Sequence, residues 1–131
     1  MEGRNAQYGA TILRVFLAAL FIVPGIGKLI NPAGIIGMLS GLGFPAASFF
    51  GWIVLLSEII FGLALLVGWK VKYTTWPLII ILIVATLIVH IPAVSMENPM
   101  TLLNVLFHLI GIAGLINIFL TGAGAWAVDK N

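Results

Sequence analysis

Apolar residues fill most of this chain, and charged residues interrupt it at few positions. No Asp, Glu, Lys or Arg occurs in 73–96 or in 98–128. A helix needs roughly 20 residues to span a hydrocarbon core of about 30 Å. Segments of this length lie at approximately 9–31, 48–69, 75–95 and 99–121. The pattern therefore predicts four membrane-spanning helices joined by short connections.

A glycine-rich stretch, Asn31–Pro45, separates the first two predicted spans. It is too short to cross a membrane, and its apolar residues suit a short helix that lies at the membrane interface. The predicted fold class is therefore all-α. We expect a four-helix antiparallel transmembrane bundle with a short interfacial helix between spans one and two, which forms a single integral membrane domain over residues 1–131.

Composition and charge agree with this prediction. The chain is 62% hydrophobic and 8% charged, which is far from the composition of an ordinary soluble domain. Four basic residues fall at the N-terminus, the second loop and the C-terminus, which a four-span chain places on one side: Arg4, Lys70, Lys72 and Lys130. The positive-inside rule then predicts that both termini are cytoplasmic. The positions of the basic residues are explained by orientation in a membrane, so the net charge of +2 gives no indication of nucleic-acid binding.

A few polar side chains lie within the spans and are candidates for a functional site. Ionisable groups are costly at membrane depth, so they normally face the bundle interior. At helical rise, the estimated depths below the outer surface are about 5 Å for Lys28, 15 Å for Glu58, 6 Å for His90 and 13 Å for His108. Asn104 falls between the two histidines. These five residues are predicted to converge in the outer half of the bundle.

Two interpretations of these residues are open. In the first, they form a structural network in which Glu58 pairs with Arg14 or with a histidine, so that no buried charge is left alone. In the second, they line a small-molecule pocket that opens to the outer leaflet. A quinone would find hydrogen-bond donors in His90, Asn104 and His108, and a proton-exchanging group in Glu58.

Haem and metal sites are disfavoured. The two histidines could ligate a haem, but their estimated depths differ by about one helical turn, and haem needs a wide cleft between helices. Glu58 and the histidines are suitable metal ligands, yet no local spacing motif joins them, so no metal site is predicted. The absence of cysteine excludes thiolate ligation, iron–sulfur centres and thiol relays.

Short motifs occur in order along almost the whole chain. They are Arg14 early in the first span, Pro24–Leu29, Leu42–Pro45, Glu58 with Gly62 and Leu65–Gly68, Asn104, and the tail Gly122–Asp129. Together they resemble the DoxX family of small four-helix integral membrane proteins. The resemblance implies a redox-linked or quinone-linked subunit in the cytoplasmic membrane of a bacterium or archaeon. The related DoxD proteins are linked to thiosulfate oxidation with quinone as acceptor. Several four-helix relatives use cysteine pairs, which this chain lacks, so a thiol oxidoreductase role is disfavoured.

The expected function is thus that of a DoxX-like membrane subunit linked to respiratory or quinone redox chemistry, with a polar pocket in its outer half. The alternative is a non-catalytic scaffold or assembly subunit of a membrane complex, in which the polar network is purely structural. Whether the chain is itself an enzyme stays open at this point. The expected partners are the lipid bilayer, together with redox proteins or further copies of the chain.

Overall fold

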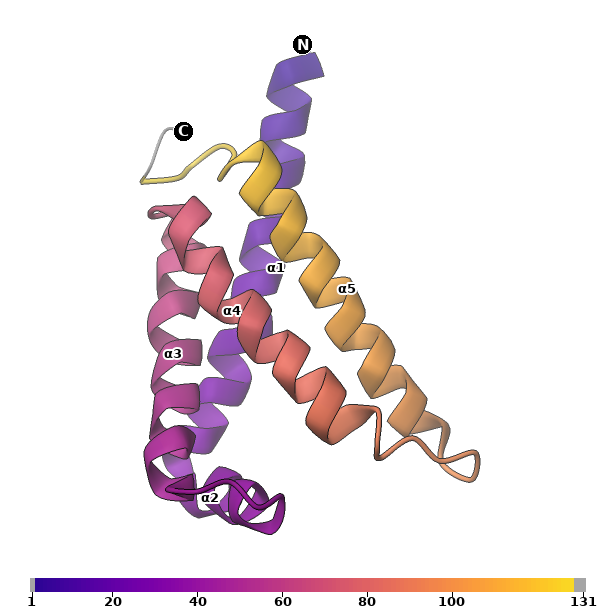
Figure 1. Cartoon of the computed structure of the whole chain (residues 1–131). Helices are drawn as coiled ribbons and strands as arrows, with labels where there is room; N and C mark the ends of the chain where they lie inside the picture. The colour runs from indigo at the N-terminus through magenta and orange to yellow at the C-terminus, as the bar shows by residue number, and fades with distance from the viewer. Residues whose placement is uncertain (1, 129–131) are drawn as a thin grey trace.

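The computed structural model describes residues 2–128, and it is built from helices (Figure 1). They are α1 (Glu2–Ile30), α2 (Pro32–Gly41), α3 (Ala47–Val67), α4 (Val71–Ala85), the π-helical turn η1 (Thr86–His90) and α5 (Pro99–Thr121). Counting η1 as the continuation of α4, four of these helices are long and apolar enough to span a membrane. No β-strand occurs in residues 2–128, so the predicted all-α four-helix bundle with a short extra helix is confirmed. Asp129 and Lys130 lie outside the described residues.

Several helix boundaries differ from those expected. Helix α1 begins at Glu2 rather than near residue 9, and α4 begins at Val71 rather than near residue 75. The chain reverses between α3 and α4 through Gly68 and Lys70, both of which have positive φ, so the next helix can begin directly afterwards. Pro77 therefore lies inside α4 and does not mark its start.

The third span ends at His90 in a wider turn. The amide of Ile91 donates to the carbonyl of Thr86 at 2.8 Å, five residues back, which is the hydrogen bond of a π turn. Pro92 follows directly and has no N–H with which to continue a helix. As a result, the span finishes before the expected residue 95, and His90 is the last residue of the π turn.

The helices form two hairpins that separate towards one end of the molecule. Helix α1 packs chiefly on α3 and α2 also packs on α3, whereas α4 and η1 pack on α5. Among the described helices, η1 contacts only α4 and α5. Figure 1 shows α4 and α5 running away from α1 and α3 towards the end at which α2 lies. We call this the α2 end. The opposite end, at which α1 begins and the tail up to Val128 lies, is the terminal end.

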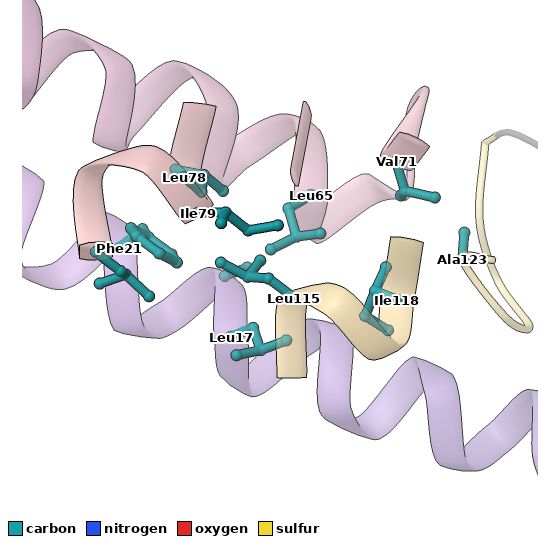
Figure 2. Close-up of a cluster of buried hydrophobic side chains, with 11 residues drawn as sticks. Leu17, Phe21, Leu65, Val71, Leu78, Ile79, Leu115, Ile118 and Ala123 are labelled. Atoms are coloured by element: carbon teal, nitrogen blue, oxygen red, sulfur yellow. The ribbon is translucent and has the colours of Figure 1, made fainter. Parts of the chain in front are cut away.

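A buried apolar core joins the two hairpins on the terminal-end side of the point where they separate. It contains Leu17 and Phe21 of α1, Leu65 of α3, and Leu78 and Leu115 of α4 and α5, which interdigitate in Figure 2. A smaller cluster of Ile35, Leu39 and Leu55 holds α2 against α3. The larger core thus fixes the crossing of the four long helices, and the smaller one fixes only α2.

Arg14 holds the terminal end together. Its side chain is almost completely buried, with 1% of the residue exposed. The guanidinium donates hydrogen bonds to main-chain carbonyls at the end of α3 and in the C-terminal tail: Leu66 at 2.7 Å, Ala125 at 3.1 Å, and Leu65 and Trp126 at 3.3 Å. Carbonyls at a helix C-terminus carry partial negative charge, so a buried cation is well placed here.

The tail reaches Arg14 because it crosses closely over α1. The Thr11 hydroxyl donates to the Ala125 carbonyl at 2.6 Å, and the Ala125 amide donates to the Gln7 carbonyl at 3.1 Å. Gly124 has a φ of 80°, and a Cβ at this position would lie 2.5 Å from the Gln7 carbonyl oxygen. Only glycine therefore fits at this crossing.

Replacement of Arg14 should destabilise the bundle. We expect Arg14→Met to lower the free energy of unfolding by about 3 kcal/mol, because leaving buried acceptors unpaired costs roughly 1–3 kcal/mol or more. The measurement is denaturant unfolding of the purified protein in detergent. Arg4→Met removes an exposed arginine from the same helix and should leave stability within about 0.5 kcal/mol of the parent. Equal losses in the two variants would contradict this account of Arg14.

Candidate functional site

A salt bridge between α1 and α3 forms the first part of the candidate site. The Lys28 ammonium donates to both carboxylate oxygens of Glu58, at 2.9 Å and 2.8 Å. Glu58 is only 6% exposed, whereas the Lys28 side chain is 27% exposed. The buried carboxylate therefore has a compensating charge, and the cation keeps one face open.

Close helix packing brings these two residues together. A Cβ at Gly25 of α1 would lie 3.2 Å from the Cβ of Glu58 and 2.9 Å from the Ile59 side chain. A Cβ at Gly62 would likewise lie 2.9 Å from the side chain of Ile22. Small residues in membrane helices permit such approaches of one backbone to another. The glycines of α1 and α3 thus set the register that places Lys28 over Glu58.

The expected pairing of Glu58 with Arg14 or a histidine is corrected by this register. Glu58 lies level with Gly25, and Arg14 lies about three helical turns before Gly25, or about 16 Å along α1. Arg14 consequently meets the end of α3. Lys28 was predicted as a ligand-binding residue, but its role as the partner of Glu58 was missed. The antiparallel register of α1 on α3 is the signal that would have found it.

A pair of histidines forms the second part of the site. The rings of His90, from η1, and His108, from α5, have centroids 4.0 Å apart and planes inclined by 39°. The two histidines that the sequence predicted to converge therefore do so. Rings in such direct contact leave no room for a haem between them, so this arrangement does not fit bis-histidine ligation.

The hydrogen bonding of His108 defines its free nitrogen. Its Nδ1 lies 2.7 Å from the main-chain carbonyl oxygen of Asn104. A carbonyl oxygen can only accept, so Nδ1 must carry a hydrogen. In the described part of the chain Nε2 of His108 has no hydrogen-bond partner, and neither does the His90 ring. A neutral His108 therefore presents a lone pair at Nε2.

Asn104 lies one helical turn from His108 and is exposed. Its side-chain amide makes no hydrogen bond to any residue within 2–128. The five predicted site residues thus divide into a Lys28–Glu58 pair on one hairpin and a His90–His108 pair on the other, with Asn104 beside the histidines.

A shallow, open groove of about 360 Å³ lies at the corner between α1 and α2. Its lining residues are Pro24, Gly27, Lys28, Asn31, Gly34, Ile35 and Met38. Leu17 and Leu20 of α1 face Gly114 and Gly111 of α5, and Pro24 and Gly27 continue the same face of α1. The groove therefore lies on the side of α1 from which α5 has turned away. The sequence did not predict a groove at this corner.

A metal-binding cluster is not found in the described residues: no three His, Asp or Glu side chains gather closely enough to hold an ion. A model of the DoxX family matches residues 9–91, which run from α1 to just beyond η1 and include Lys28, Glu58 and His90. Neither curated proteins nor solved structures give a significant match. The family match covers more than half of the chain and confirms the resemblance seen in the sequence motifs.

The Lys28–Glu58 pair predicts an asymmetric response to mutation. Lys28→Met should lower the free energy of unfolding by about 3 kcal/mol, the lower end of the range for stranding a buried charge, because the Lys28 side chain is 27% exposed. The double variant Lys28→Met/Glu58→Met should recover most of this loss, since an apolar pair leaves no charge to desolvate. Lys72→Met, at an exposed position of α4, is the matched control. If Lys28→Met behaves like Lys72→Met in denaturant unfolding, the pair does not neutralise Glu58.

Proposed function

The chain belongs to the DoxX family, and from that premise we propose that it is a membrane subunit linked to respiratory redox chemistry. Its polar site at the α2 end accommodates a quinone-like molecule. Lys28, Glu58, His90, Asn104 and His108 are the residues proposed to surround this ligand.

The observation that carries the proposal is the position of the two polar pairs. Lys28–Glu58 and His90–His108 lie on different hairpins, near the level at which α4–η1–α5 separates from α1–α3. Packing alone does not require costly polar groups to gather at one depth on separate hairpins. An open groove beside Lys28 supplies space at this level.

The chemical character of the site suits an amphipathic aromatic ring. Lys28 can donate one further hydrogen bond, because Glu58 takes two of its three ammonium hydrogens. His108 offers Nε2, and the groove residues Pro24, Ile35 and Met38 offer apolar walls. A long apolar tail would extend from the groove into lipid. Because the chain contains no cysteine, electrons would pass through the bound molecule or a partner protein.

We further propose that the protein lies in the cytoplasmic membrane of a bacterium or archaeon with both termini in the cytoplasm. The α2 end, with the groove, would then face the outer side. Arg4, Lys70 and Lys72 all lie towards the terminal end, which supports this orientation. Redox proteins or further copies of this chain are the proposed partners.

A second candidate function is that of a scaffold or assembly subunit. The completeness of the Lys28–Glu58 pair favours it, since both carboxylate oxygens are satisfied within the chain. In that case the polar residues serve stability alone. Ligand binding separates the two functions.

Quinone binding by the purified protein is the test. We expect ubiquinone and menaquinone analogues to bind the parent, and Glu58→Gln and His108→Ala to weaken binding by about tenfold, the effect of losing one hydrogen bond or charge contact of about 1.4 kcal/mol. Titration in detergent or nanodiscs, monitored by equilibrium dialysis, gives the dissociation constants.

The matched control is Asn117→Ala, which removes an exposed polar side chain from α5 about two and a half helical turns from His108. It should bind as the parent does, and size-exclusion profiles should show that every variant remains folded. If no analogue binds the parent, or if the site variants bind as tightly as the control, the pocket hypothesis fails and the scaffold takes its place.

A further inference from the structure

The outward face of α5 carries a polar side chain that the bundle leaves partly unpaired. We propose that this face binds a second copy of the chain, and that Asn117 hydrogen-bonds to Asn117 of the partner subunit across a two-fold axis. The inference goes beyond the proposed function, because it selects one of the two classes of partner and places the contact on residues outside the polar site at the α2 end.

Helix α5 lies at the edge of the bundle (Figure 1). It packs on α4, η1 and α1, and on no other helix in the part of the chain that the structure describes. A stripe of side chains on its remaining face, at helical spacings of four, three and four residues, is exposed: Leu106, Ile110, Ala113 and Asn117. In a membrane, this stripe must meet either lipid or another protein.

Asn117 is the polar member of this stripe, and its hydrogen-bonding capacity is only partly used. The Thr121 hydroxyl donates to the main-chain carbonyl of Asn117 at 2.8 Å and lies 3.4 Å from its Oδ1. The Nδ2 hydrogens of Asn117 have no acceptor among residues 2–128. Oδ1 also keeps a lone pair free. The side chain therefore offers both a donor and an acceptor to whatever covers α5.

The depth of Asn117 in the membrane disfavours lipid as the cover. At helical rise, Asn117 lies about 10 Å from the middle of α5, and half of the hydrocarbon core is about 15 Å thick. Acyl chains neither donate nor accept hydrogen bonds, so an amide exposed to them is costly. Asparagine side chains that pair across membrane helices instead stabilise helix association. Asn117 thus favours protein over lipid on this face.

A second copy of the chain complements this face. A carboxamide is its own partner, because the donor of one amide meets the acceptor of the other, and a two-fold axis repeats that bond in both directions. Ala113 lies one helical turn from Asn117, and its small side chain lets two α5 backbones approach closely. No charged residue occurs in 98–128, so nothing on α5 selects a partner by charge.

Cysteine cross-linking in the membrane tests the position of the contact. The chain contains no cysteine, so an introduced thiol can pair only with its counterpart in another copy or with a different protein. Ala113→Cys should form a disulfide-linked dimer on mild oxidation, because residues where two helices cross lie within disulfide reach. Ala19→Cys is the matched control: it replaces an exposed alanine of α1 and should stay monomeric.

Two cross-linking results would overturn the inference. The first is a dimer of equal yield from Ala113→Cys and Ala19→Cys, which indicates random collision. The second is an Ala113→Cys protein that stays monomeric or links to a different protein, which shows that lipid or another partner covers α5.

Sedimentation equilibrium in detergent tests the role of the amide. The parent should be a dimer, and Asn117→Leu should raise its dissociation constant about tenfold, equivalent to about 1.4 kcal/mol, which is within the range for one interhelical hydrogen-bonded pair. Asn117→Gln keeps the amide and should stay within about threefold of the parent. A monomeric parent, or an Asn117→Leu variant that associates as tightly as the parent, overturns the inference. Neither measurement involves quinone, so the proposed function is tested separately.

Discussion

The buried carboxylate of Glu58 is the group on which the arrangement at the α2 end depends. A charge that is 6% exposed in an apolar span must be paired, and Lys28 is the cation that reaches it. That contact requires the backbones of α1 and α3 to approach within the distance that Gly25 and Gly62 allow. The charge, the glycines and the register of the first hairpin are therefore one structural unit. Arg14 does the same at the terminal end, where its hydrogen bonds join α3 to the tail.

The sequence predicts those features that are local in the chain, and it fails for those that depend on how distant helices pack together. Hydrophobic length alone indicates the four long helices, and the glycine-rich segment after Asn31 indicates α2, because both are local properties of the chain. The pairing of Glu58 was mistaken because it depends on the register between two helices, which composition does not reveal. The meeting of His90 and His108 was predicted, since their helices are antiparallel neighbours joined by a short loop. The groove depends on where α5 leaves α1, and no residue pattern encodes that divergence.

The separation of the two hairpins gives the fold its functional potential. The core of Leu17, Phe21 and Leu115 fixes the crossing, and beyond it η1 touches only α4 and α5 among the described helices. The π turn that ends at His90 is of the kind often found at functional sites. The turn that carries His90 therefore packs on its own hairpin and not on α1, α2 or α3.

The central claim is that a quinone-like molecule binds at the α2 end, against the groove between α1 and α2. Photo-crosslinking with a quinone analogue that carries an azide on its ring, followed by peptide mass spectrometry, tests it most directly. The account predicts adducts in 24–38 of α1 and α2 and in 104–111 of α5, suppressed by excess unlabelled quinone. Adducts spread over lipid-facing residues such as Phe16 and Leu120, and insensitive to the competitor, would contradict it.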